Sequence, residues 1–298
     1  MTSPVLVSEE RFARVGEIEL CWQQFGEEND PPLLMIMGLG AQMILWPEEL
    51  CELIAVEGYR VIRFDNRDSG RSTKLDSAAR GSIQDALSGQ IPEGAYKLTD
   101  MAGDAAGLLD ALGIEAAHIV GASLGGMIAQ TLAIEQPERV LSLASLMSTT
   151  GNPEVGRPTP QGLAGLTTVP PRDRDGYVLA LVEARRLIGS PGFPFDEERA
   201  AGVARLGFDR GYFPEGTVRQ TIAILASKDR TAQLGRVDVP TVVIHGDDDP
   251  LIEVSGGRAT AAAIPGSKLV LIEGMGHDFP AGVWEQVAAE IAENARKA

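Results

Sequence analysis

The chain has 298 residues, of which 44% are hydrophobic, so it can bury the core of one large α/β domain or of one domain with an insert. Its 26 Lys and Arg and its 42 Asp and Glu give a net charge of −16, which argues against nucleic acids and anionic membrane surfaces as partners. Cys21 and Cys51 are too few for a disulfide framework or a zinc site, and we expect reduced thiols in the core. No basic segment followed by a long apolar one opens the sequence, which predicts a cytoplasmic protein.

Short apolar runs alternate with stretches of helical length. Eight strands are predicted, at residues 11–15, 18–24, 33–37, 60–64, 117–120, 140–147, 241–245 and 268–272. Five helices are predicted, at residues 47–56, 98–112, 124–136, 253–263 and 283–298. This alternation predicts a mostly parallel, eight-stranded sheet with helices on both faces. Residues 116–134 lack charged side chains and are long enough for a membrane span, but the glycines in their middle favour a core strand followed by a helix.

One segment interrupts the alternation. Residues 152–235 are rich in proline and glycine, no buried strand is predicted there, and the pattern at 178–187 indicates short amphipathic helices. Aromatic residues cluster in this segment, at Tyr177, Phe193, Phe195, Phe208, Tyr212 and Phe213. We predict a helical cap at 151–236, inserted after the sixth strand between two parts of the core at 1–150 and 237–298. The cap would shape a substrate pocket at the carboxyl edge of the sheet; the alternative is a packed helical layer without a role in binding.

Residues 121–126, with the sequence GASLGG, lie between the predicted strand at 117–120 and an apolar helix. This is the pattern of a nucleophile elbow, in which a tight turn lifts Ser123 clear of the sheet. The flanking glycines let the backbone pass close to its neighbours, and the helix start supplies N–H donors and the positive end of the helix dipole. Because the pattern alone is a weak signal, the alternative is a glycine-rich turn between a buried strand and a buried helix.

A serine hydroxyl is a poor nucleophile unless a base takes its proton. The chain has three histidines. His277 lies in a glycine-flanked loop after the last predicted strand, so it shares the carboxyl edge of the sheet with Ser123 and is the predicted base. His118 opens the strand before the elbow, at the opposite end of the sheet, and is expected to be structural. His245 ends the seventh strand and is expected to support the site or to belong to a turn.

The base needs a carboxylate that fixes its tautomer. The sixth predicted strand ends without an acid, whereas the seventh is followed by Asp247, Asp248 and Asp249. One of these three is the predicted acid, and the other two are expected to be solvated. The order Ser, Asp, His along the chain is the one found in α/β-hydrolases.

Over essentially its whole length the chain resembles the α/β-hydrolase superfamily, and within it the capped bacterial esterases that include aclacinomycin methylesterase. The likeness rests on residues 37–40 (MGLG), 64–72 (FDNRDSGRS), 121–126, 246–250 and 274–277. The resemblance implies the α/β-hydrolase fold and a serine hydrolase. It assigns the acid to Asp249 through the family pattern G-x-x-D, with Asp248 as the rival.

The resemblance also implies an oxyanion hole made by the backbone N–H groups of Leu39 and Leu124. Many relatives have His-Gly where this chain has Met37 and Gly38, but a backbone donor does not depend on that side chain. The charged loop at 65–72 is a structural hallmark of the family and receives no catalytic role. Three apolar residues are expected either to line an acyl pocket or to pack against the sheet: Met43, Leu45 and Trp46.

These residues predict a carboxylic-ester hydrolase that needs no cofactor and no metal and that acts on small to medium hydrophobic esters through an acyl-serine intermediate. The chain has neither a metal-ligand cluster nor a glycine fingerprint for phosphates. Lactone opening, perhydrolysis and proline-iminopeptidase-like amide cleavage are alternatives on the same triad. A serine at the elbow argues against the haloalkane dehalogenases and epoxide hydrolases, which use aspartate. A non-catalytic ligand-binding protein of the same fold is the alternative of a different class.

Overall fold

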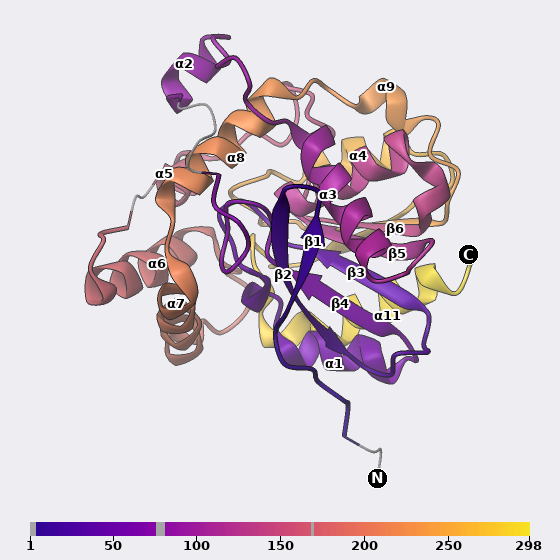
Figure 1. Cartoon of the computed structure of the whole chain (residues 1–298). Coiled ribbons are helices and arrows are strands. Elements are labelled where there is room, and N and C mark those ends of the chain that lie inside the picture. The colour runs from indigo at the N-terminus through magenta and orange to yellow at the C-terminus, as the bar shows by residue number, and fades with distance from the viewer. Residues whose placement is uncertain (1–3, 76–80, 168–169) are drawn as a thin grey trace.

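The chain folds around one eight-stranded sheet (Figure 1). The structure is a computed structural model that describes residues 4–75, 81–167 and 170–298. The strands are β1 (Arg11–Val15), β2 (Ile18–Phe25), β3 (Pro32–Ile36), β4 (Arg60–Phe64), β5 (Ala117–Ala122), β6 (Val140–Leu146), β7 (Thr241–Gly246) and β8 (Lys268–Ile272). Their order is β1-β2-β4-β3-β5-β6-β7-β8, with antiparallel pairs from β1 to β4 and parallel pairs from β4 to β8. The carboxyl ends of β3 to β8 therefore share one edge, where ligands bind in open α/β sheets.

Strand β3 shows how the sheet is buried on both faces. The side chains of Leu33, Leu34, Met35 and Ile36 have no exposed surface. Successive side chains of a strand point to opposite faces of a sheet. Leu34 and Ile36 accordingly pack into one hydrophobic cluster, and Leu33 and Met35 pack into the other. A sheet with this pattern requires helices on both sides.

Helices cover both faces, as Figure 1 shows. On one face lie α3 (Leu98–Ala111) and α4 (Leu124–Glu135), and on the other lie α1 (Glu48–Val56) and α11 (Trp284–Ala295). Helix α10 (Ser255–Ala263) packs against β7 and β8. The shorter elements are α2 (Ile83–Leu87), α9 (Thr231–Leu234) and three 3₁₀ turns, Met43–Leu45, Pro137–Arg139 and Ala281–Val283.

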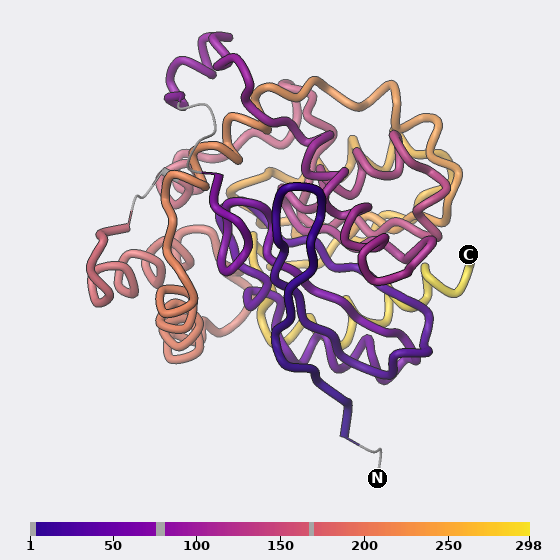
Figure 2. Tube along the Cα trace, in the orientation of Figure 1, coloured from indigo at the N-terminus to yellow at the C-terminus, as the bar shows by residue number. Residues whose placement is uncertain are grey.

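Within the described residues, four longer helices and α9 lie between β6 and β7 in the chain, and we call the four longer ones the insert. They are α5 (Pro160–Thr167), α6 (Arg174–Ile188), α7 (Glu197–Gly211) and α8 (Pro214–Ala226). The tube in Figure 2 leaves the sheet after β6, builds this group at one side of it and returns to β7. The insert has a small core of its own, where Tyr177 and Val182 of α6 pack with Ala204 of α7. The division into two core parts and a cap at 151–236 stays a prediction, and residues 168–169 lie outside the described residues.

The predicted eight-stranded, mostly parallel sheet with helices on both faces is confirmed. The predicted strands and helices agree with the observed ones to within about three residues at each end. In the described part of the segment between β6 and β7 no strand is present, as predicted.

Cys21 and Cys51 are both buried and unpaired. None of the helices in the described ranges combines the length and the apolar character that a bilayer crossing requires.

Candidate active site

Ser123 occupies the sharp turn between β5 and α4. Its backbone has φ 56° and ψ −120°, and a positive φ is uncommon for residues other than glycine. The Ser123 N–H donates to the carbonyl of Leu146 on β6 (2.9 Å), and Ser148 Oγ donates to the carbonyl of Ser123 (2.8 Å). A backbone in this conformation is strained, and it persists only where several neighbouring contacts hold it. Strained residues cluster at functional sites. The turn has the strand–turn–helix geometry that a nucleophile elbow requires.

Close backbone contacts explain the glycines of the elbow. A Cβ on Gly121 would overlap the carbonyl of Gly125, and a Cβ on Gly125 would overlap the carbonyl of Ile36 at the end of β3. A Cβ on Gly126 would overlap the side chain of Ser148. Because these positions carry no side chain, α4 begins directly against the ends of β5 and β3. The loop after β3 is thereby brought next to the serine.

That loop passes the Ser123 side chain. A Cβ on Gly38 would lie 3.2 Å from Ser123 Cβ and 3.6 Å from Ser123 Oγ. Leu39 comes next, and Leu124 follows Ser123 as the first residue of α4. Within the described residues, neither the Leu39 N–H nor the Leu124 N–H donates to a protein acceptor. Donors without an acceptor among the described residues are what the predicted oxyanion hole requires.

His277 lies in the loop after β8, and the insert holds this loop in place. The His277 N–H donates to the carbonyl of Ile188 (2.7 Å), and the Gly276 N–H donates to Ser190 Oγ (2.8 Å). Only 7% of the His277 side-chain surface is exposed. The imidazole is therefore largely shielded from water, at the carboxyl edge of the sheet where β5 also presents Ser123.

Asp249 lies in the turn after β7 and accepts a hydrogen bond from His277. His277 Nδ1 is 2.7 Å from Asp249 Oδ2, and Asp249 Oδ1 accepts from the N–H groups of Leu251 (2.8 Å) and Ile252 (2.9 Å). Burial alone would raise the pKa of this carboxyl group, but the charge of His277 and the hydrogen bonds from His245 and His277 lower the pKa well below its usual range. An ionised carboxylate only accepts, so it fixes His277 with the proton on Nδ1.

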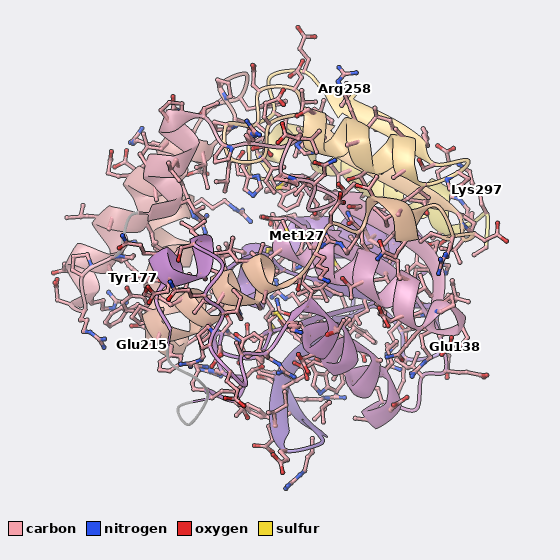
Figure 3. All side chains as sticks on the ribbon, turned by 90° about the horizontal axis from the view of Figure 1, so that it is seen from above. Met127, Glu138, Tyr177, Glu215, Arg258 and Lys297 are labelled. Atoms are coloured by element: carbon pink, nitrogen blue, oxygen red, sulfur yellow. The ribbon has the colours of Figure 1, made fainter. Side chains whose placement is uncertain are left out.

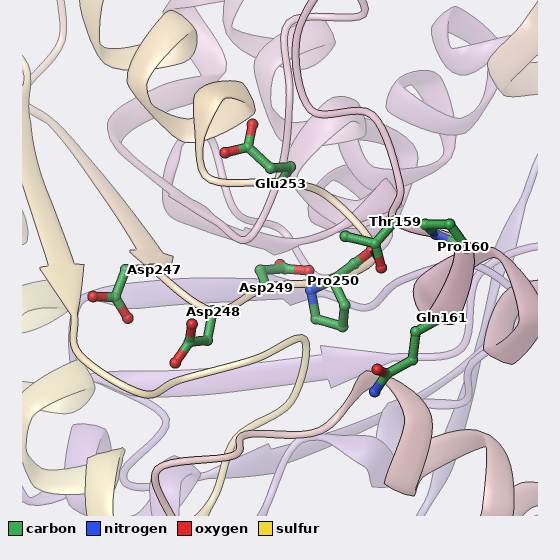
Figure 4. Close-up of a pocket in the computed structure, with 8 residues that line it drawn as sticks. All are labelled: Thr159, Pro160, Gln161, Asp247, Asp248, Asp249, Pro250 and Glu253. Atoms are coloured by element: carbon green, nitrogen blue, oxygen red, sulfur yellow. Dashed lines mark hydrogen bonds between the residues drawn. The ribbon is translucent and has the colours of Figure 1, made fainter.

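Asp247, Asp248 and Asp249 follow one another in the turn after β7 (Figure 4). Asp247 and Asp248 are exposed, whereas Asp249 is buried. Asp247 Oδ1 accepts from the Gly274 N–H (2.8 Å), which joins the turn after β7 to the loop after β8. A recess of about 510 Å³ opens here, lined by Thr159, Pro160, Gln161, Asp247, Asp248, Asp249, Pro250 and Glu253. Neither Ser123 nor His277 belongs to this lining.

The other two histidines lie in the core. His118 Nδ1 is 2.9 Å from Ser142 Oγ near the start of β5, in accord with the structural role expected of it. His245 Nε2 is 2.7 Å from the carbonyl of Ile252 and 3.5 Å from Asp249 Oδ2, so this nitrogen carries the proton and His245 contacts the carboxylate of Asp249. Among the residues that the structure describes, no three His, Cys, Asp or Glu side chains are arranged to hold a metal ion.

Two buried ion pairs that join the insert to the core were not found from the sequence. Arg210 of α7 pairs with Asp65 (2.9 Å), and Arg219 of α8 pairs with Asp68 (2.8 Å). Side-chain exposure is 8% or less for all four residues. The partners are 145 and 151 residues apart in the chain, and no local motif connects them. The loop at 65–72 thus binds the insert as well as the core.

Some of the aromatic and apolar residues that were weighed as pocket lining pack against one another or lie in the core. Three aromatic rings of the insert contact one another: Tyr177, Phe208 and Tyr212. Figure 3 shows Tyr177 out in the insert, apart from Met127 of α4 near the middle of the molecule. Met43 and Trp46 have no exposed surface, which favours packing over pocket lining.

Comparisons with known proteins identify the family. Residues 31–280 match the family model described as alpha/beta hydrolase fold. The chain belongs to the α/β-hydrolase family. The enol-lactonase from Burkholderia xenovorans LB400 shares the fold, with a TM-score of 0.71 at 24% identity over 96% of this chain and 100% of that one.

Two curated relatives of the chain are enzymes. Rhodomycin D methylesterase DnrP of Streptomyces peucetius is 34% identical over 97% of this chain and 98% of its own length. The 3-oxoadipate enol-lactonase 2 of Acinetobacter baylyi is 27% identical over 86% of each chain. The predicted likeness to bacterial methylesterases and the predicted class, a carboxylic-ester hydrolase, are confirmed.

Proposed function

We propose that this α/β-hydrolase cleaves carboxylic esters with Ser123 as nucleophile, His277 as base and Asp249 as the acid of a catalytic triad. The observation that carries the proposal is the 2.7 Å hydrogen bond from His277 Nδ1 to the buried Asp249, at the edge of the sheet to which the strained elbow presents Ser123. Because His277 Nδ1 donates its proton to the carboxylate, Nε2 of the neutral ring is unprotonated. Nε2 is the atom that takes the serine proton in such triads. The positions of the three residues after β5, β7 and β8 fit this assignment.

In the acylation step, Ser123 Oγ attacks the ester carbonyl carbon while its proton moves to His277 Nε2. The negative charge on the carbonyl oxygen is bound by the N–H groups of Leu39 and Leu124. Collapse of the intermediate breaks the bond to the alcohol, which leaves with the proton from His277. A water molecule then attacks the acyl-serine by the same proton route and releases the carboxylic acid.

Asp249 serves both steps through its charge. Because its pKa is lowered, the carboxylate is ionised throughout the neutral range. It therefore stabilises the imidazolium that forms when His277 takes a proton, and it keeps the ring in one orientation. The two backbone N–H groups on Asp249 Oδ1 prevent the carboxylate from turning away.

We propose a small to medium hydrophobic ester as the substrate and the insert as a cap over the site. The insert contacts the His277 loop through Ile188 and Ser190, and it contacts the loop after β3 through α8. The methylesterase relatives support a methyl ester, since their name states this bond in rhodomycin D. The enol-lactonase relative makes lactone opening the second candidate, because a lactone is a cyclic ester that the same steps would cleave.

A panel of methyl, aryl and cyclic esters tests the proposal. The purified protein is expected to hydrolyse open-chain esters and to be labelled by a fluorophosphonate at Ser123. Ser123→Ala is expected to lose both properties while its circular dichroism spectrum is unchanged. Undiminished ester cleavage by Ser123→Ala would refute the assignment, and faster opening of lactones than of matched open-chain esters would favour the second candidate. A folded protein that neither reacts nor labels would be a ligand-binding member of the family.

A further inference from the structure

A glutamine of the insert is fully buried beside the proposed oxyanion hole. Gln220 lies on α8 and has no exposed surface. Its Oε1 accepts from the Gly40 N–H (2.8 Å), and its Nε2 donates to the carbonyl of Arg67 (2.8 Å). One side chain of the insert thus bridges the loop after β3 and the loop after β4.

Gly40 directly follows Leu39, whose N–H is one of the two proposed oxyanion donors. Its φ of 62° is in the left-handed region, and a Cβ there would overlap the side chain of Thr217 on α8. On the other side of Leu39, Gly38 lies against the Ser123 side chain. The backbone of Leu39 is therefore held between the elbow and α8.

Two further hydrogen bonds of this loop come from the core. Asn66 Nδ2 donates to the carbonyl of Met37 (2.9 Å), and Ser69 Oγ donates to the carbonyl of Ala41 (2.7 Å). Within the loop the Ala41 N–H donates to the carbonyl of Gly38 (3.3 Å), and beyond it Gln42 Nε2 donates to the carbonyl of Gly207 on α7 (2.7 Å). Gln220 Oε1 is the acceptor for the peptide N–H next after that of Leu39.

Helix α8 is itself fixed to the core next to Gln220. Arg219 Nε and Nη2 each lie 2.8 Å from an oxygen of Asp68, and the Tyr96 hydroxyl donates to the same carboxylate (2.9 Å). This buried pair keeps α8 from sliding along the loop. Gln220 is therefore a rigid support and not a mobile surface side chain.

We propose that Gln220 is a positioning residue that aims the Leu39 N–H at the oxyanion, so that the insert completes the oxyanion hole of the core. The proposal rests on the proposed function. Without Gln220 the Gly40 N–H has lost its acceptor, so the peptide between Leu39 and Gly40 can rotate, and the preceding peptide, which carries the Leu39 N–H, is held less firmly. Removal of one oxyanion donor costs about 10²–10³-fold in kcat, and a displaced donor should cost less, about 10- to 100-fold.

The test compares two glutamine-to-methionine variants. Gln220→Met keeps the length of the side chain and removes both hydrogen bonds. Gln130→Met is the matched control: Gln130 has no exposed surface, and its amide contacts Ser145 Oγ (3.1 Å) and Arg230 Nε (3.2 Å). Both variants are expected to unfold at lower temperature. Only Gln220→Met should lower kcat, by about 10- to 100-fold with KM changed less than about threefold.

The inhibition constant of a trifluoromethyl ketone distinguishes a positioning role from a merely structural one, because a loss of stability alone would not change it. This inhibitor forms a tetrahedral adduct with a serine and places an oxyanion where the transition state has one. Its inhibition constant should weaken in Gln220→Met by the same factor as kcat/KM and should stay within about twofold in Gln130→Met. Equal weakening in both variants, or none in Gln220→Met, overturns the proposal.

Gln220→Glu covers the case in which the methionine variant fails to fold. A carboxylate still accepts from the Gly40 N–H but has no proton for the Arg67 carbonyl, whereas a protonated carboxyl group restores both bonds. The kcat of Gln220→Glu relative to that of the wild type at the same pH should therefore rise as the pH falls. A ratio that stays about tenfold or more below one down to the lowest pH contradicts the proposal.

Amide hydrogen exchange separates this proposal from the proposed function. If the wild-type protein neither cleaves esters nor binds the ketone, the proposed function fails. The Gly40 amide should still exchange faster in Gln220→Met than in Gln130→Met, since its acceptor is gone. Equal protection of this amide in the two variants overturns the positioning role whether or not the protein is an esterase.

Discussion

The contact between Asp249 and His277 can be tested with a change that keeps its shape. Asn has nearly the size of Asp but carries one oxygen and one NH₂ group. Because Asp249 Oδ1 accepts from the N–H groups of Leu251 and Ile252, the asparagine oxygen has to stay on that side. The NH₂ group then faces His277 Nδ1, which has to accept, so the imidazole proton moves to Nε2. An imidazole protonated there cannot take the proton of Ser123.

The expected loss in Asp249→Asn follows from this exchange of tautomers. The same substitution in a serine protease triad lowers kcat about 10⁴-fold, which corresponds to about 5.5 kcal/mol of barrier. The cost in folding stability should be smaller, about 1–3 kcal/mol, because the variant loses one charge-assisted hydrogen bond and keeps the two to the backbone. A loss of activity far larger than the loss of stability is therefore the signature of the triad.

The assay is steady-state hydrolysis of one activated aryl ester, with urea unfolding curves to establish that each variant is folded. Asp248→Asn is the control, since it removes the same charge from an exposed neighbour. Its kcat should change by less than about twofold, because exposed charges are screened by solvent. A folded Asp249→Asn protein that keeps more than about one tenth of the wild-type kcat would refute the reasoning. So would an equal loss in Asp248→Asn.

Three further predictions concern the elbow and the insert. Ser123→Gly should be inactive but about 1 kcal/mol more stable than Ser123→Ala, because only glycine adopts this positive φ without strain; equal urea midpoints would speak against strain at the turn. Gly125→Ala should abolish activity and lower the melting temperature, since its Cβ overlaps the end of β3, and full activity would contradict that close contact. Gly202→Ala is the control, on the exposed side of α7 where a Cβ meets nothing within 4 Å. It should raise the free energy of unfolding by about 0.5–1 kcal/mol. Arg210→Met should lower the free energy of unfolding by about 3–5 kcal/mol, because it leaves Asp65 buried without its cation; an unchanged calorimetric melting temperature would show that this pair does not hold the insert.

Local patterns in the sequence determined the sheet, its helices and the elbow. Strand, tight turn and helix are neighbours in the chain at Ser123, so apolar runs and glycines a few residues apart specify them. The place of His277 after the last strand was also predictable, because the carboxyl ends of parallel strands meet at one edge. These features depend on short stretches of chain and on the rules of sheet topology.

The tertiary structure decided which of three adjacent aspartates is buried against His277, a choice that the residues left open and that only the family pattern assigned to Asp249. Asp247, Asp248 and Asp249 have the same chemistry and nearly the same neighbours in sequence, and only folding distinguishes their burial. It also decided that Gln220 reaches Gly40, a residue 180 positions away in the chain. Burial and hydrogen bonding of this kind depend on distances between segments that the sequence does not place side by side. The sequence by itself therefore determined the elements that bear the proposed chemistry, and the packing of the insert on the core decided how they are held.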